Sequence, residues 1–437
     1  MNGWIIVVIA IVYVTLLFAI ASFGDRNAAR RSMTYSRPTI YALSLAIYCT
    51  SWTFFGSVGL ASEKGFEYLG IYAGPVLAFM FGFPLIQRIV RLAKSEKITS
   101  IADFLAARYG KSFTVASVAT LIAIIAVIPY IALQLKAISG SLRLMAEHTG
   151  TIYPSSQSFI GDISLLVAIL LAAFAVLFGT RHTDATEHQD GLVLAIAVES
   201  VVKLAAFLFI GISITFFMFG DFSAFSSAVA ANADVRQAMA HQSSLATWLI
   251  HIAISGIAIF MLPRQFYVMF VENRTENELH TAHWLFPVYL IAINIFVLPI
   301  AFAGLAFLPQ GTSADLFVVA VPLAQGDNLL AMIAFIGGLS AATAMVIVET
   351  VALSIMISND LVIPLFIRRL LHPERGDNEN WSRIILTIRR ASIFLVLLAA
   401  FLYYREIAGN ARLASIGLLS FAAVAQFAPA FFGGLAW

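Results

Sequence analysis

The sequence has few charged residues and a single cysteine, Cys49. Charged residues make up 11% of the chain, against about 25% in soluble domains, so a water-facing surface is excluded over most of the molecule. One cysteine excludes an intrachain disulfide and an all-cysteine metal site. No basic segment is interleaved with aromatic residues, which excludes the usual nucleic-acid-binding patterns. We also find no nucleophile elbow, phosphate-binding glycine loop or zinc spacing, so the chain offers no catalytic site.

Hydrophobic residues, by contrast, make up 60% of the 437 residues, above the roughly 45–50% of soluble domains. A helix that crosses a bilayer needs roughly 20 apolar residues. Eleven stretches meet this requirement: 4–23, 39–60, 68–90, 113–137, 163–179, 190–218, 246–271, 283–307, 328–358, 386–404 and 413–437. The sequence therefore predicts an all-α polytopic membrane protein.

The positively charged residues are distributed unevenly between the loops. Nineteen of the 26 Lys and Arg residues follow odd-numbered spans, among them Arg264 and Arg274 after the seventh span. Five lie in the opposite loops, and two, Lys136 and Lys203, lie inside spans. Because cytoplasmic loops carry the excess of positive charge, this distribution predicts a multi-pass protein with its N-terminus outside.

Eleven spans divide into one extra helix and two groups of five. The first helix of each group, 39–60 and 246–271, runs in opposite directions across the membrane. Two groups of opposite orientation are typical of inverted-repeat transporters. We therefore expect an extra helix with a basic loop over 1–38, a first repeat over 39–245 and a second repeat over 246–437.

Inverted-repeat transporters bind substrate and ions where the first helix of each repeat is unwound. In the first repeat, residues 49–59 place small hydroxyl side chains and two glycines within a span. In the second repeat, His251, Ser255, Gly256 and Pro263 interrupt an apolar run. These patterns predict two broken helices. The alternative is ordinary helix packing, since Gly, Ser and Thr are common at membrane helix interfaces.

A short segment between the third and fourth spans, Thr99 to Gly110, has its own helix signals. Ser100 and Asp103 have the spacing of a capping box, and Gly110 is placed to end the helix. The apolar residues share one face. The pattern predicts a short amphipathic helix at the cytoplasmic surface.

This segment resembles the cytoplasmic threonine–acidic–aromatic–leucine–arginine–aromatic–glycine signature of sodium/solute symporters. The resemblance covers essentially the whole chain. It implies a LeuT-type fold of two inverted five-helix repeats preceded by one extra helix, in the bacterial inner membrane. It also implies a small polar solute as the ligand.

Four further blocks resemble a narrower branch, the symporter-like membrane domains of CbrA-type sensor histidine kinases. These blocks are residues 48–59, 128–136, 262–266 and 337–350. In that branch, dimerisation and kinase modules follow the membrane domain. Because the chain stops at Trp437 inside an apolar stretch, we expect kinase modules beyond residue 437 and a response regulator as their partner.

The chain departs from the family's pattern at the sodium site. Sodium-coupled members carry a hydroxyl pair sixteen and fifteen residues before an acidic residue. Counting back from Asp360 gives Ala344 and Met345, which offer no hydroxyl. Thr343 and Ser340 lie nearby but point elsewhere around the helix. The coupling ion is therefore expected to be a proton in preference to sodium, and no cofactor is predicted.

Four residues inside spans are candidates for ion or proton coupling. Glu199 and Lys203 are four residues apart on one helix face, and Thr343 and Glu349 lie in the ninth span. Ionisable groups at membrane depth are costly and by default mark function. The alternatives are a structural ion pair for Glu199 and Lys203, and a hydrogen bond to a neighbouring helix for Glu349.

Candidate substrate-binding residues lie at the two predicted breaks and on the fourth span. They are Thr50, Ser51, Trp52, Tyr130, Gln134, His251 and Ser255. The alternative for Tyr130 and Gln134 is interhelical hydrogen bonding, and for His251 it is packing.

These observations predict a domain that binds and transports an amino acid. Resemblance to the CbrA branch implies histidine as the amino acid, and coupling of its binding to a C-terminal sensor histidine kinase in nutrient sensing. The alternatives are a stand-alone amino-acid symporter and a receptor that has lost transport. Whether the parent protein is an enzyme depends on the kinase modules.

Overall fold

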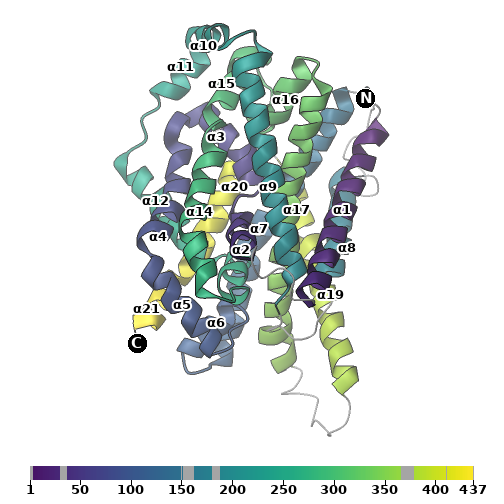
Figure 1. The fold of residues 1–437 in the computed structure, drawn as a ribbon, viewed down its shortest axis with the longest axis vertical. Coiled ribbons are helices and arrows are strands. Elements are labelled where there is room, and N and C mark those ends of the chain that lie inside the picture. The colour runs from purple at the N-terminus through teal and green to yellow at the C-terminus, as the bar shows by residue number, and fades with distance from the viewer. Residues whose placement is uncertain are drawn as a thin grey trace.

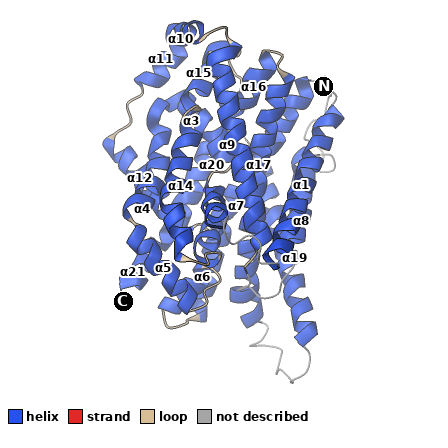
Figure 2. Ribbon diagram, viewed as in Figure 1, coloured by secondary structure: helices blue, strands red, loops and turns tan. Residues whose placement is uncertain are grey.

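The computed structural model describes residues 3–29, 37–148, 150, 162–179, 188–365, 378–409 and 411–436. Every regular element among these residues is a helix (Figure 2). Six of the basic residues assigned to loops lie outside the described residues: Arg30, Arg31, Arg181, Arg368, Arg369 and Arg375.

Seven of the described helices are long and apolar enough to cross a membrane. They are Ile5–Arg26, Phe113–His148, Asp190–Met218, Glu276–Phe307, Asn328–Leu365, Ser382–Ala408 and Leu413–Ala436. Two bent pairs raise the number to nine. The first bent pair, Arg37–Tyr48 with Trp52–Phe81, covers the second predicted span and much of the third. The fifth predicted span corresponds to the shorter apolar helix Ile163–Leu177.

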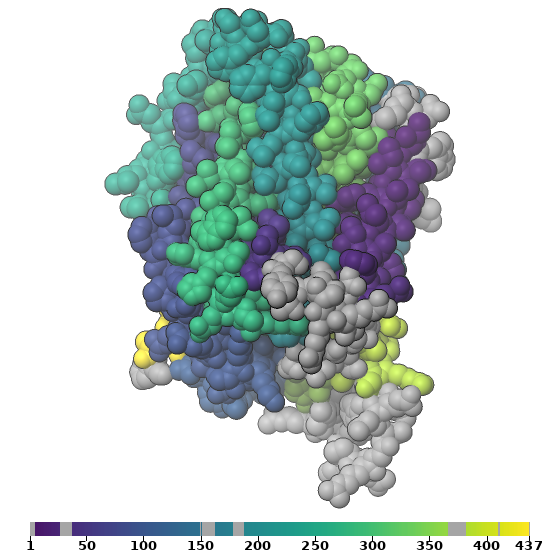
Figure 3. Space-filling view, in the orientation of Figure 1, coloured from purple at the N-terminus to yellow at the C-terminus, as the bar shows by residue number. Residues whose placement is uncertain are grey.

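The helices form one bundle (Figure 1). α1 (Gly3–Ala29) lies on the outside against α9 (Asp190–Ser213), and Figure 3 shows α1 in purple at the right. Gly24 of α1 faces Gly191 of α9. α17 (Asn328–Met356) lies at the centre, and from Gly337 to Met356 all its residues are buried. Large apolar side chains such as Val12, Ile125 and Leu395 remain exposed, as a lipid-facing surface requires.

The remaining helices fill the space between these. α7 (Phe113–His148), α8 (Ile163–Gly179) and α19 (Asn378–Tyr403) pack around α17. α14 (Glu276–Asn294) and α15 (Val297–Phe307) form one bent span, and α20 (Leu413–Val424) and α21 (Ala428–Ala436) form the last. α10 (Phe222–Ala231), α11 (Ala233–Ala240) and α16 (Phe317–Ala324) lie at one end of the bundle, opposite α6 (Ile101–Arg108) (Figure 1).

The first predicted helix break is confirmed. α2 (Arg37–Ser44) continues as a 3-10 turn, Leu45–Tyr48, and then stops, because Cys49 is extended with φ −80° and ψ 97°. The helix resumes at Trp52–Gly56 and continues as α3 (Ser57–Lys64). The bend between the helical segments before and after this break is 62°. Gly65 follows with φ 54°, and a Cβ there would lie 2.6 Å from the Ala238 carbonyl. Only glycine fits this turn into α4 (Leu69–Phe81) and α5 (Phe83–Ser95).

The second break lies at Pro263 and not at His251, Ser255 or Gly256. α12 (Leu245–Met261) is continuous through these three residues, so the prediction that they interrupt the helix is wrong. Leu262 is extended with φ −64° and ψ 127°, and α13 (Pro263–Phe266) begins afterwards. Proline lacks the N–H that would continue the helix and pushes the preceding residue out of the helical region.

The helix predicted over Thr99–Gly110 is also confirmed. α6 begins at the N-cap Ser100, whose hydroxyl accepts from the Asp103 N–H at 3.0 Å. The Asp103 carboxylate accepts from the Thr99 N–H at 2.9 Å, and burial raises the pKa of this carboxyl while the Thr99 bonds oppose the shift. The Phe104 ring packs on Phe266, at 5.7 Å between centroids. The short helix is thereby attached to the second break.

Close packing at the first break depends on two glycines of α17. A Cβ at Gly337 would lie 2.6 Å from the Phe54 ring, and one at Gly338 would overlap atoms of the Phe55 ring. Since both phenylalanines lie just after the break, these glycines let α17 approach it directly. The same contact brings Ser340, Thr343 and Glu349 into the centre of the bundle.

Candidate functional site

The first break is held by a lysine from another helix. Lys203 of α9 is 1% exposed, and its ammonium donates to the carbonyls of Ala46 and Cys49 at 2.7 Å each. A helix end leaves carbonyls unpaired and carries a partial negative charge, which favours a cation there. The structure thus places the lysine side-chain nitrogen where the first helix is unwound.

Glu199 lies one turn before Lys203 and faces α17. The Thr343 hydroxyl donates to the Glu199 carboxylate at 2.5 Å, and the Ser340 hydroxyl donates to the Glu199 carbonyl at 2.9 Å. The hydroxyls of Ser340 and Thr343 are therefore both engaged by α9. The structure brings three of the four residues predicted for ion or proton coupling, Glu199, Lys203 and Thr343, to the same place, and their role in coupling stays a prediction.

Two residues of α7 hold the other side of the break. The hydroxyls of Thr50 and Tyr130 are hydrogen-bonded at 3.0 Å, and the Ser51 N–H donates to the Gln134 side-chain oxygen at 3.1 Å. All four residues are buried. Tyr130 stacks on Phe421 of α20, with 5.7 Å between centroids and 7° between planes. These four predicted substrate-binding residues are thus brought together.

Trp52 is the fifth predicted residue at this break, and it faces α20. Its indole N–H donates to the Ala414 carbonyl at 3.2 Å. The ring packs on the backbone at Gly417, where a Cβ would lie 2.7 Å from the indole nitrogen. Trp52 therefore joins the break to the last span.

The second break contributes Arg264 and Gln265. Arg264 is 0% exposed, forms an ion pair with the equally buried Glu349, and places its Cζ 4.5 Å from the Tyr130 ring centroid. The Gln265 amide donates to the Leu45 carbonyl at 3.2 Å, across to the first break. The two breaks are therefore in direct contact through these side chains.

Arg264 is not among the site residues predicted from the sequence. The prediction that it lies in the loop after the seventh span is wrong, because its side chain is fully buried. The available signal was Pro263, which marks the break one residue earlier. The partner of this arginine is Glu349, whose predicted role in ion or proton coupling stays a prediction.

His251 and Ser255 lie elsewhere, on the face of α12 that packs against α4. The ideal Cβ position at Gly70 is 3.1 Å from the His251 Cβ, and Gly74 faces the Ser255 hydroxyl. That hydroxyl donates to the carbonyl of His251 at 2.7 Å within its own helix. The structure does not bring these two residues to Thr50 or Tyr130, so their predicted role in substrate binding is not supported by position.

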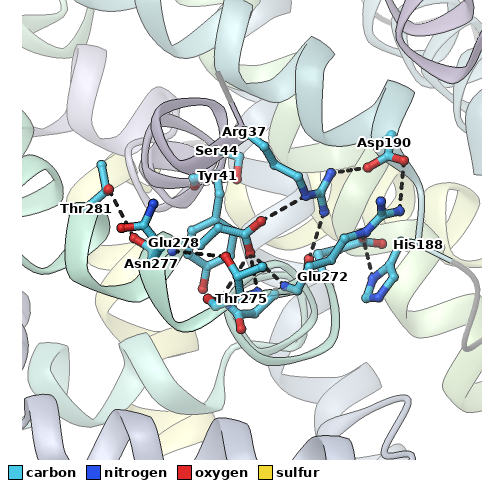
Figure 4. A network of polar contacts seen from close by, with 12 residues as sticks. Arg37, Tyr41, Ser44, His188, Asp190, Glu272, Thr275, Asn277, Glu278 and Thr281 are labelled. Atoms are coloured by element: carbon cyan, nitrogen blue, oxygen red, sulfur yellow. Dashed lines mark hydrogen bonds and ion pairs between the residues drawn. The ribbon is translucent and has the colours of Figure 1, made fainter. Parts of the chain in front are cut away.

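A polar network surrounds Arg37, and Figure 4 shows its contacts. Arg37, at the start of α2, pairs with Asp190 of α9 and donates to Glu278 of α14 at 2.9 Å. It also donates to the Glu272 carbonyl at 3.2 Å. The Glu278 side chain completes a capping box with Thr275. The network fixes the N-terminal end of the first broken helix to two other helices.

Next to this network, Lys94 of α5 donates to the Asn273 side chain at 2.8 Å. Burial lowers the pKa of this ammonium, and the nearby carboxylates of Glu278 and Glu276 oppose the shift. Lys94 also lines a cavity of about 280 Å³ between α5 and the loop after the second break.

A larger cavity, of about 560 Å³, lies between α3, α7, α15, α16 and the residues just before α20, and Ser62, Lys136, Asp315 and Arg412 line it. Lys136 donates to the carbonyls of Ala408 and Gly409 at 3.2 and 2.9 Å. The central residues lie between this cavity and the network at the other end. Among the described residues, no three His, Cys, Asp or Glu side chains are grouped so as to hold a metal ion.

No protein-family model matches the chain. Two curated proteins of Bacillus subtilis strain 168 are similar in sequence, both described as uncharacterized symporters. YhjB is 22% identical over 323 residues, 72% of this chain and 62% of YhjB, and YodF is 22% identical over 390 residues, 89% of this chain and 72% of YodF. The chain therefore spans less than two thirds of the length of YhjB.

A solved structure of a Na+-coupled sialic acid symporter, substrate-bound and outward-open, is similar in fold. The TM-score is 0.66 at 14% sequence identity, over 99% of this chain and 87% of that one. This likeness confirms the predicted fold class, a polytopic membrane protein of the LeuT type. The repeat boundaries at 39–245 and 246–437 stay predictions.

Proposed function

We propose that the chain is a symporter domain that moves a small polar solute, an amino acid, with protons as the coupling ion. The observation that carries the proposal is the Lys203 ammonium bound to the Ala46 and Cys49 carbonyls at the first break. The two sequence relatives and the structural neighbour, all named as symporters, support the general activity.

The preference for protons follows from the occupancy of these carbonyls. Unwound backbone carbonyls are the groups that coordinate coupling cations in transporters of this kind. Here the Lys203 ammonium already occupies that position, and a second cation beside it would be repelled. Glu199, one turn away and hydrogen-bonded to Thr343, is a carboxylate that can take up or release a proton. Buried acid–base pairs of this type mark proton pathways in membranes.

Proton movement would change the hold on the first helix. A charged Lys203 binds both carbonyls strongly, whereas a neutral amine keeps only weaker hydrogen bonds. Loss of that charge therefore weakens the contact between α9 and the break. In this proposal the basic loops are cytoplasmic and the N-terminus is outside, so the Arg37 network is the cytoplasmic closure.

Histidine is the amino acid that we propose from the resemblance of the 48–59 and 262–266 blocks to CbrA-type proteins. On the same ground we propose that substrate occupancy is passed to a sensor histidine kinase module. Alternating access is a two-state element that ligand binding can bias. Phosphorylation of the intact parent protein, measured with and without L-histidine in nanodiscs, tests this signalling role. Unchanged phosphorylation would contradict it.

Uptake into proteoliposomes tests the transport proposal. Radiolabelled L-histidine is supplied under a sodium gradient alone, a pH gradient alone, both together or neither, with the remaining nineteen amino acids as competitors. We expect accumulation to follow the pH gradient. Accumulation that needs sodium and ignores pH would refute proton coupling. Binding without accumulation under either gradient would leave only the receptor alternative.

A further inference from the structure

Arg264 has more hydrogen-bonding capacity than the described residues use. Its Nη1 donates to Glu349, whereas Nε and Nη2 are buried and have no hydrogen-bond partner within the described part of the chain. A guanidinium presents Nε–H and one Nη–H as a planar fork that matches the two oxygens of a carboxylate. An unpaired buried donor costs free energy, so two of them on a charged group indicate a ligand position.

Glu349 has the complementary property. One of its oxygens accepts from Arg264, and the other, Oε1, is buried without a partner among the described residues. A carboxylate oxygen accepts hydrogen bonds only, so the free atom calls for a donor. The ion pair therefore presents an unused donor fork on one side and an unused acceptor on the other.

The charge balance of the pair limits which net charge the ligand can carry. Arg264 and Glu349 together are neutral, and both are fully buried. A simple carboxylate anion would add a net charge in a medium of low dielectric constant, which is costly. A zwitterion adds none, because its ammonium brings the compensating charge. The pair therefore fits a ligand that carries a carboxylate and an ammonium close together.

We infer that Arg264 and Glu349 form a clamp for the zwitterionic backbone of an α-amino acid, with the carboxylate on the Arg264 fork and the ammonium on Glu349 Oε1. This inference rests on the proposed transport of a small polar solute, and it specifies which part of the solute is recognised. It assigns recognition of the carboxylate to Arg264 at the second break and recognition of the ammonium to Glu349 of α17.

The surroundings agree with such a ligand. The Ser51 hydroxyl, the Tyr48 hydroxyl and the Gln265 side-chain oxygen are also buried and unpartnered in the described segments. Tyr48 lies near Phe286 and Phe421, at 6.4 and 5.9 Å between ring centroids. Unused polar atoms next to aromatic rings provide both hydrogen bonds and apolar contact for a solute side chain.

Ligand-induced stabilisation of the full chain in nanodiscs tests the clamp. The probes are the twenty L-amino acids. The best stabiliser is then compared with its decarboxylated amine, its deaminated acid and its carboxamide. We expect each of the three analogues to bind about 10- to 100-fold more weakly than the parent, since each loses a charge-assisted contact. Equal binding of the amine or carboxamide would overturn the inference, and so would the absence of stabilisation by any amino acid.

Arg264→Lys keeps the positive charge and removes the fork. We expect it to weaken amino-acid binding about tenfold or more and to erase the preference for the acid over its carboxamide. Arg91→Lys, at an exposed position of α5, is the matched control and should bind as the unchanged chain does. Retained preference in Arg264→Lys would refute the clamp. If that variant does not fold, the analogue series on the unchanged chain decides alone.

The two proposals fail in different ways. An amino acid that binds with the expected analogue pattern but never accumulates would refute symport and leave the clamp intact. Accumulation of a solute that competes equally with its carboxamide would refute the clamp and leave symport intact.

Discussion

Replacing Lys203 with methionine tests the central interaction at the first break. Methionine keeps most of the length and apolar volume of the lysine stem but provides no donor and no charge. The Ala46 carbonyl still accepts from the Cys49 N–H at 3.0 Å. The larger effect of the substitution is therefore on the Cys49 carbonyl, which loses its hydrogen bond from Lys203. Its lost partner costs about 1–3 kcal/mol. Glu199 also loses the neighbouring cation, and it avoids the larger cost of an unpaired buried charge only by taking up a proton.

We therefore expect Lys203→Met to destabilise the closed arrangement of the first break by about 2–4 kcal/mol. At the lower end, 2 kcal/mol raises the population of the opened break by about 30-fold. Cys49 is the only cysteine of the chain and is 0% exposed, so it reports this opening directly. Its rate of modification by a membrane-permeant maleimide should rise by about 30-fold or more.

The same variant should lose accumulation driven by the pH gradient. Lys111→Met is the matched control, because Lys111 is 79% exposed at its side chain and its ion pair with the partly exposed Glu96 is long, at 3.5 Å. The control should label and transport as the unchanged chain does. Slow labelling of Cys49 in Lys203→Met, together with uptake that still follows the pH gradient, would show that the lysine neither holds the break nor couples protons.

Three further predictions concern the network, the packing and the acid. Arg37→Gln should speed maleimide labelling of Cys49 in inside-out vesicles, because it releases the first broken helix from α9 and α14; unchanged labelling would show that the network is not a closure. Gly338→Ala should cost about 1–3 kcal/mol through overpacking and lower the unfolding midpoint in detergent, whereas Gly433→Ala, with its nearest atom at 3.5 Å, should leave it unchanged. Glu199→Gln imitates the protonated acid, so counterflow exchange should persist while solute accumulation driven by a pH gradient is lost. Preserved accumulation would exclude Glu199 as the proton carrier.

Much of the fold could be predicted because a bilayer imposes strong patterns on sequence. Span length follows from the thickness of the hydrocarbon, and the short helix Ile101–Arg108 follows from its own capping residues. The first break was also visible, since small polar residues and two glycines stand together within 49–59. Each of these signals is local and needs no knowledge of what packs where.

The second break shows where local reasoning fails. Ser255 and Gly256 look like helix breakers, yet they serve a close contact with Gly74 that only the tertiary structure reveals. Arg264 looks like a loop residue, because a charge near the end of an apolar stretch usually is one. Its partner Glu349 lies 85 positions away in the chain, and no pattern in one sequence pairs them. The positions of His251 and Ser255 on the face of α12 that packs against α4 could not be predicted for the same reason.

The contacts across the two breaks provide a physical link between the proposed solute binding and the proposed proton movement. Lys203 of α9, Gln134 of α7 and Gln265 of α13 each bond to backbone atoms between Leu45 and Ser51. The unwound segment is thus held by three helices at once. In the proposed mechanism, a solute that engages Arg264 acts on the residue before Gln265, and a proton that leaves Lys203 weakens the contact of α9 with the same segment. Both events therefore bias one element, which is the physical requirement for coupling two ligands.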